Sequence, residues 1–221
     1  MRLVVWNCAG AVRKKWSSIE GLQPDVAVII ECDQPARIAN LGFDSSAWVG
    51  RIPHKGLAVF GFGDWKVLDA DFVEDRLEYV LPVHISGPAE FDLYGVWASN
   101  RRASVQLPGH EHLPQPHALM DVYQPSRSPR PAIIAGDFNN SAYWDKPRRS
   151  RFADMAKRYE QEGFHSLYHH QTGEEFAAEA SPTHWWRDRR EDGHASTSTT
   201  SSCLSHWRTA RRSESPGSRN R

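Results

Sequence analysis

Residues 131–140 read PAIIAGDFNN, and this stretch decides what kind of sheet the chain builds. Its apolar centre, AIIA, is short and lies between a proline and Gly136, which is typical of a strand covered on both faces. The run ends in Asp137 and Asn139, which on a strand point to the same side, and Gly136 permits close backbone approach. A plain turn is the alternative interpretation, because Asp and Asn are common turn residues.

Two further apolar runs end in polar residues in the same way. Residues 2–8 (RLVVWNC) end near Asn7, and residues 26–32 (VAVIIEC) end near Glu31. Residues 11–22 between them carry apolar side chains at helical spacing, so the chain is expected to open as strand–helix–strand. Because ligands of layered α/β folds collect at the carboxyl ends of buried strands, these polar residues are candidates for one shared site.

The rest of the chain is richer in strands than in helices. The close spacing of the strand candidates indicates antiparallel neighbours, and a sheet-on-sheet core with outer helices is the economical fold. Strands are expected at 46–51, 56–62, 65–73, 77–85, 91–98 and 181–187, and helices at 117–123 and 151–164.

Length and composition favour one globular domain in a reducing cytoplasm. The 221 residues are 39% hydrophobic, enough for a substantial core, and contain no apolar run of membrane-spanning length. The first residues enter a strand directly, without the features of a signal peptide. Cys8, Cys32 and Cys203 are too scattered for a disulfide framework or a zinc site. We expect a cytoplasmic monomer without a membrane partner.

Charge is unevenly distributed although the formal net charge is zero. Residues 194–221 hold five Arg and one Glu, a charge of +4, which leaves −4 for residues 1–193. Proteins that bind nucleic acid through its phosphates usually carry a basic surface, not a net negative charge. The main body therefore lacks that electrostatic signature.

The polar strand ends suit a hard divalent cation and hydrolytic chemistry. Carboxylate and amide oxygens, as in Asn7 and Glu31, are the ligands that Mg²⁺ or Mn²⁺ prefers. Asp137 is a candidate to take a proton from an attacking water. Asn139 is a candidate to hold a phosphate oxygen or to orient that Asp.

Two structural alternatives compete with a divalent-cation site. A buried Glu needs a cation or a basic partner, so a salt bridge is expected if no metal binds. The candidate partners of Glu31 for that bridge are Lys14, Lys15 and Arg51. Histidines cluster at 109–112 (GHEH) and 169–171 (HHQ), where solvated loop residues are a better interpretation than a transition-metal centre.

Taken together, these segments resemble the endonuclease/exonuclease/phosphatase superfamily, which has the DNase I-like or exonuclease III-like fold, in its small bacterial members. The resemblance covers about residues 1–190 and rests on VVWNCAG, DVAVIIEC, GLAVFGF, LYGVWA, IIAGDFNNSAYWD and SPTHWW, in this order and spacing. It implies an α/β (α+β) four-layer sandwich, with two mixed β-sheets packed face to face and outer helices. It also implies Mg²⁺- or Mn²⁺-dependent phosphoester hydrolysis.

The resemblance implies a role for each polar strand end. Asn7 and Glu31 correspond to residues that serve the metal. Asp137 corresponds to the residue that activates or orients the attacking water, and Asn139 to the one that holds the scissile phosphate. The implied substrate is a phosphodiester or phosphomonoester, and nucleic acid is the usual one. A catalytically inactive phosphate- or nucleic-acid-binding module is the alternative function.

The chain departs from the superfamily pattern at two places. After the middle strand the family usually supplies a His or Tyr, whereas this chain reads VWASNRR, so Asn100 or Arg101 is the candidate phosphate contact. The second departure is the lack of a late His-x-Asp-Tyr strand and of an Asp-His pair near the C-terminus. The last strands and the catalytic His are therefore expected to be missing.

A shifted reading frame explains the missing motifs. Residues 196–202 read STSTTSS, and codons for these residues can be written so that a one-base shift yields HIDYFF, with Val from the codon of Cys203. We hypothesise that the frame slips near residues 193–195. Residues 1–193 are then a C-terminally incomplete domain, and 194–221 an out-of-frame, disordered tail. A natural Ser/Thr- and Arg-rich disordered tail is the alternative.

Overall fold

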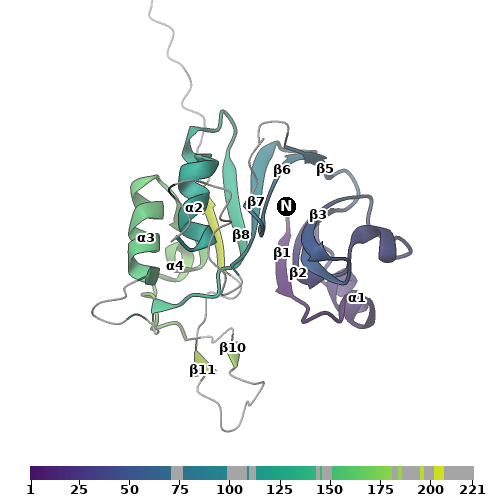
Figure 1. Cartoon of the computed structure of the whole chain (residues 1–221), viewed down its shortest axis with the longest axis horizontal. Helices are drawn as coiled ribbons and strands as arrows, with labels where there is room; N and C mark the ends of the chain where they lie inside the picture. The colour runs from purple at the N-terminus through teal and green to yellow at the C-terminus, as the bar shows by residue number, and fades with distance from the viewer. Residues whose placement is uncertain are drawn as a thin grey trace, which may run out of the picture.

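Two large β-sheets lie at the centre of the computed structural model (Figure 1). The described residues are 1–70, 77–98, 109, 113–142, 145, 151–180, 184–185, 195–196 and 202–206.

The first sheet is mixed and has four strands in the order β1-β2-β4-β3. β1 and β2 are parallel, whereas β4 runs antiparallel to both of its neighbours. β1 is half-buried rather than fully buried, because it lies at the edge of the sheet. The strands are β1 (Leu3–Asn7), β2 (Val26–Cys32), β4 (Lys55–Gly61) and β3 (Ser45–Ile52).

The second sheet is also mixed and has six strands in the order β5-β6-β7-β8-β12-β9. Only β7 and β8 are parallel among its pairings in the described residues. A separate ladder joins β10 (His184–Trp185) to β11 (Ala195–Ser196). The six strands are β5 (Lys66–Asp69), β6 (Val80–Ser86), β7 (Phe91–Trp97), β8 (Ala132–Asp137), β12 (Ser202–His206) and β9 (His165–Ser166).

The central strands pack on both faces, as their continuous apolar runs predicted. On β2, Val26, Val28 and Ile30 lie in the core between the two sheets. The residues that alternate with them pack on the outer face, where Trp16 of α1 (Val12–Gly21) covers the sheet. Successive residues of β2 therefore point to opposite faces of the sheet, and both sets are buried in apolar layers.

Helices cover the outer face of the six-stranded sheet. Phe152, Met155 and Tyr159 of α3 (Arg151–Gln161) are buried there, on the face that the sequence predicted. α2 (Gln115–Val122) packs in the same layer. The expected four-layer sandwich of two mixed sheets with outer helices is confirmed (Figure 1).

None of the helices in the described ranges combines the length and apolar character that a membrane span requires. The short helices are α4 (Leu167–Thr172), η1 (Pro35–Arg37) and η2 (Pro125–Arg127).

The C-terminal region contributes a strand to the sheet, which corrects one expectation. β12 pairs antiparallel with β8, with Ser202 opposite Gly136 and His206 opposite Ala132. The prediction that the last strands are missing is therefore wrong at this position, and residues 195–196 and 202–206 of the expected tail lie in strands. The reason is that the free edge of β8 offers backbone donors and acceptors, which an extended segment satisfies whatever its side chains. The remaining tail residues lie outside the described ranges.

Gly136 allows β7 and β8 to pair closely just before the strand end. Its φ is +152°, and a Cβ atom there would lie 1.9 Å from the carbonyl oxygen of Val96. We expect Gly136→Ala to lower the free energy of unfolding by about 3 kcal/mol, because backbone must move to relieve this overlap. Gly21→Ala, where a Cβ meets nothing within 4 Å, is the control and is expected to be neutral or slightly stabilising. Urea unfolding of both variants measures the difference, and equal effects would contradict it.

Candidate active site at the strand ends

The carboxyl ends of β1, β2 and β8 converge, as their polar endings predicted. Asn7 Nδ2 donates a 3.0 Å hydrogen bond to Asp137 Oδ2 and so links the last residues of β1 and β8 across the two sheets. Glu31, on β2 beside β1, is near enough to act electrostatically on Asp137. The structure thus brings these three predicted site residues together. Asn100 and Arg101, the candidate phosphate contacts, lie outside the described residues.

Asn139 joins the site through its backbone. β8 ends at Asp137, and Asn139 has a φ of +43°, so the two residues are not on one strand as the same-side prediction required. Instead the Asn139 N–H donates to Asp137 Oδ1 over 2.9 Å. This is the turn alternative, in which an Asp side chain binds the backbone two residues on. The turn fixes the orientation of the Asp137 carboxylate with a second donor.

Backbone in the left-handed region concentrates at these strand ends. Ala9, Glu31 and Asn139 have φ values of +49°, +58° and +43°, and they are three of the six described non-glycine residues with positive φ. Such backbone is uncommon outside glycine, and it persists only where surrounding contacts enforce it. Conformations of this kind cluster at functional sites, which supports the assignment of one here.

Glu31 is held in its conformation by the loop that follows β1. The pairing of β2 with β4 shifts register between Ile30 and Cys32, so Glu31 occupies a bulge. The Gly10 N–H donates to the Glu31 carbonyl over 3.1 Å, and the Cys8 thiol donates to the same oxygen over 3.3 Å. The bulge and these two hydrogen bonds therefore fix the backbone position from which the Glu31 carboxylate extends.

The basic partner of Glu31 is a residue that the sequence did not indicate. Lys55 Nζ lies 3.1 Å from Glu31 Oε2, whereas Arg51 pairs with Glu78 and Lys15 donates to the Cys8 carbonyl. In the described part of the chain, none of the candidates Lys14, Lys15 and Arg51 makes the salt bridge to Glu31, so the choice of partner was wrong. Lys55 comes close because it begins β4, which runs antiparallel to β2 and meets the end of that strand. No local sequence pattern marks this partner, because the contact depends on the register in which β4 pairs with β2.

The pKa of Asp137 is raised above its usual value, mainly because the carboxyl group is buried. Burial, with a residue exposure of 1%, is the main effect that raises the pKa of Asp137 to about 6. Hydrogen bonds from Asn7 and from the Asn139 backbone oppose the rise, and the negative charge of Glu31 adds to it. A buried carboxyl with a pKa near neutrality is able to exchange a proton at physiological pH.

The donor set fits a hard divalent cation. Two carboxylates interact repulsively here, and the described part of the chain has no cluster of three His, Cys, Asp or Glu able to hold a metal by itself. Mg²⁺ and Mn²⁺ prefer oxygen ligands and usually keep several bound waters. The side-chain oxygens of Glu31 and Asn7, completed by water, are ligands of this kind. A bound cation would offset the repulsion between the negative charges of Glu31 and Asp137.

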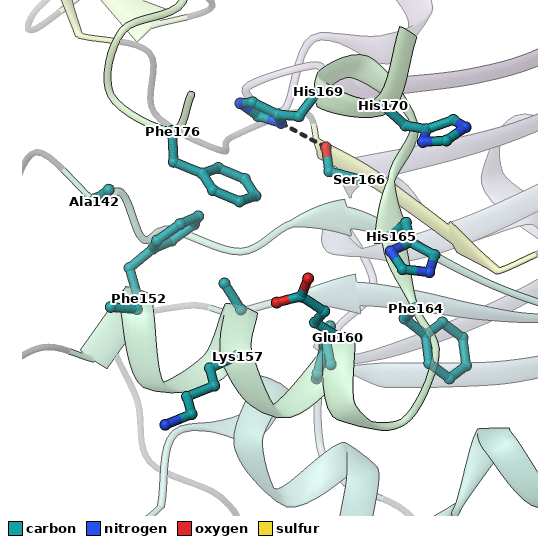
Figure 2. Close-up of a pocket in the computed structure, with 13 residues that line it drawn as sticks. Ala142, Phe152, Lys157, Glu160, Phe164, His165, Ser166, His169, His170 and Phe176 are labelled. Atoms are coloured by element: carbon teal, nitrogen blue, oxygen red, sulfur yellow. Dashed lines mark hydrogen bonds between the residues drawn. The ribbon is translucent and has the colours of Figure 1, made fainter. Parts of the chain in front are cut away.

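The histidine-rich segment at 169–171 lies on α4, away from the strand ends. A pocket of about 440 Å³ opens between α3 and α4, with Phe152 and Phe176 on one side and His169 above them (Figure 2). Both ring nitrogens of His169 are engaged, Nδ1 with Ser166 Oγ at 2.7 Å and Nε2 with Glu179 Oε1 at 3.1 Å. His169 lies on a helix with only 13% of its side chain exposed, so the interpretation of 169–171 as solvated loop residues is wrong at this residue. The histidines within 109–112 lie outside the described residues.

Comparison with known proteins identifies the fold. Neither a protein-family model nor a curated protein sequence matches this chain significantly. Among solved structures, an AP endonuclease from Archaeoglobus fulgidus matches with a TM-score of 0.60 and 14% identity, over 92% of this chain and 84% of that one. The 3′ phosphatase NExo from Neisseria, bound to a product DNA hairpin, matches with a TM-score of 0.59 and 16% identity, over 93% and 86%. Truncated TDP2 from Caenorhabditis elegans matches with a TM-score of 0.58 and 12% identity, over 92% and 83%.

These neighbours have the DNase I-like fold of the endonuclease/exonuclease/phosphatase superfamily, and this chain shares that fold. The fold expected from the sequence resemblance is therefore confirmed over most of the chain.

Proposed function

We propose that this fold carries the site of a Mg²⁺- or Mn²⁺-dependent phosphoester hydrolase. The observation that carries the proposal is the meeting of Asn7, Glu31 and Asp137 at the strand ends, with the pKa of Asp137 raised to about 6. Structural neighbours that include a nuclease and a phosphatase support the same reaction class.

Each described residue has a distinct part in the proposed reaction. Glu31 and Asn7 offer oxygens to the cation, which when bound polarises a phosphoryl oxygen and steadies the leaving oxygen. Asp137 accepts the proton of the attacking water, in an orientation set by its bonds to Asn7 and the Asn139 N–H. The Asn139 side chain holds a phosphate oxygen. Beyond the described residues, Asn100 or Arg101 contacts the phosphate more weakly.

The substrate is proposed to be a phosphodiester or phosphomonoester, with nucleic acid as the leading candidate. NExo was solved with a product DNA hairpin, and TDP2 from D. rerio, with a TM-score of 0.53 and 14% identity, was solved with single-strand DNA product. The acidic charge of residues 1–193 favours a small phosphoester instead. Binding that weakens steeply with salt would identify the nucleic acid, because it reports released counterions.

We further propose that the chain as written is impaired, because it lacks the C-terminal Asp and His motifs that the resemblance implies. A catalytically inactive phosphate- or nucleic-acid-binding module is the second candidate function, and the same absence favours it. Both proposals predict that the chain as written binds the cation and turns over little substrate. Restoring the reading frame separates them, as only an impaired enzyme recovers turnover.

Cation binding and turnover test the proposed function directly. We expect Mn²⁺ to bind the chain as written and Glu31→Gln to weaken that binding by about tenfold or more, since a ligating carboxylate is lost. Glu160→Gln, on α3 and away from the strand ends, is the matched control. A frame-restored chain, shifted by one base near codons 193–195, is expected to hydrolyse a generic phosphodiester, and EDTA is expected to abolish this. Mn²⁺ affinity that is equal in wild type and Glu31→Gln would contradict the proposed site.

A further inference from the structure

Lys55 carries a positive charge next to Glu31, which is a metal ligand in the proposed function. A metal ion could use Glu31 only if this carboxylate were free of Lys55. Its Nζ lies 3.1 Å from Glu31 Oε2 and 5.5 Å from the centroid of the Trp97 ring. Trp97 is opposite Asp137 in the parallel pairing of β7 and β8. Lys55 is thus held between a carboxylate and an aromatic face at the mouth of the site, with 44% of its side chain exposed.

The two members of this ion pair differ in their freedom to move. Glu31 sits in a bulge whose carbonyl receives hydrogen bonds from Gly10 and Cys8, so its backbone position is fixed. Lys55 has a long, flexible side chain, whose contacts within the described residues are the ion pair with Glu31 and the face of the Trp97 ring. When the pair opens, the lysine is therefore the member that swings away.

A carboxylate oxygen that faces an ammonium group at 3.1 Å is not free to serve a divalent cation, because the two positive charges repel. The ammonium group that leaves Glu31 remains in the site, where phosphate oxygens of a substrate are its natural partners.

We infer that Lys55 is an exchange cation, paired with Glu31 while the site is empty and with a substrate phosphate oxygen once Glu31 serves the metal. This inference rests on the proposed function and adds a substrate-binding residue to it. It predicts opposite effects of one substitution on two ligands. Without the lysine charge, Glu31 is more available to a metal, whereas a phosphate loses a charge-assisted partner.

The test uses Lys55→Met in the full chain, with Mn²⁺ and inorganic phosphate as probes. Free Mn²⁺, followed by its electron paramagnetic resonance signal, is expected to bind the variant about threefold to fivefold more tightly than wild type. Inorganic phosphate is expected to bind the Mn²⁺-loaded variant about fivefold to tenfold more weakly, measured by calorimetry. Lys55→Arg retains the charge and is expected to stay close to wild type on both measurements.

Lys66→Met is the matched control, since Lys66 is on β5, at the edge of its sheet and separated from β8 by two strands. It is expected to leave both affinities unchanged. Circular dichroism confirms folding of each variant, and Lys55→Gln replaces Lys55→Met if the latter fails to fold. Mn²⁺ affinity that is unchanged or weakened by Lys55→Met overturns the exchange role and leaves the proposed metal site standing. Absence of Mn²⁺ binding in wild type and variant alike overturns both.

Discussion

Asp137→Asn is expected to reduce phosphoester turnover of the frame-restored chain by about 10²–10⁴-fold while it raises the stability of the protein at pH 7. The loss of turnover follows from removal of the group that we propose to accept the proton of the attacking water. The gain in stability follows from the site itself, where a carboxylate is buried beside Glu31. Opposite effects on activity and stability are typical of a residue kept for chemistry.

The pH dependence of this gain has a definite sign. The pKa of Asp137 is raised from 3.8 to about 6 on folding, so the folded state binds the proton more tightly than the unfolded state. The stabilisation by that proton is fully present below about pH 4 and is lost as the pH rises through 6. At pH 7 the ionised carboxylate therefore costs about 3 kcal/mol, and an amide avoids this cost but gives up one hydrogen bond of about 1 kcal/mol. The expected net gain is about 1 to 2 kcal/mol at pH 7 and none at pH 4.

Urea unfolding in EDTA at the two pH values measures this gain without interference from metal. Asp64→Asn is the control, because Asp64 is exposed in a turn and its replacement is expected to change little at either pH. A variant of Asp137 that is less stable than wild type at pH 7 would contradict the electrostatic account. Turnover that survives the substitution would contradict the role of Asp137 as the base.

The positions of the site residues in the sheets could be predicted from the sequence. Apolar runs that end in Asn7, Glu31 and Asp137 are properties of single segments, and the carboxyl ends of covered strands meet at one place in this class of fold. The layers follow from the same runs, because a strand without polar alternation must be covered on both faces.

The contacts between segments could not be predicted in the same way. The Lys55–Glu31 pair depends on the register of β4 against β2 and on the bulge at Glu31, which no local pattern encodes. The β12 strand depends on the free edge of β8, and edge pairing is nearly indifferent to side chains. Sequence patterns therefore predicted where the polar strand ends lie, whereas strand pairing determined which residues they contact.

The position of β12 explains why the frame-restored chain is expected to gain activity. β12 runs antiparallel to β8 with Ser202 opposite Gly136, so residues that precede Ser202 on a longer strand would continue past Asp137. The one-base shift places His-Ile-Asp-Tyr at about residues 197–200, which a restored strand would carry to the site. An Asp beside the strand ends would support the catalytic core, as the resemblance implies.

We expect the frame-restored chain to hydrolyse a generic phosphodiester with Mg²⁺ or Mn²⁺ about 10²–10⁴-fold faster than the chain as written, because a positioned acid or base contributes about that much. The restored chain with Asp137→Asn is the control, and its turnover is expected to fall back toward background. Sequencing the gene across codons 185–221 and past the stop decides whether the restoration is natural. Bases that forbid the His-Ile-Asp-Tyr reading, or equal turnover of the two chains, would refute the shifted frame and favour a binding module. A gene that permits the reading, together with recovered turnover, would assign the hydrolase function to the uninterrupted protein and its loss to the altered C-terminal residues.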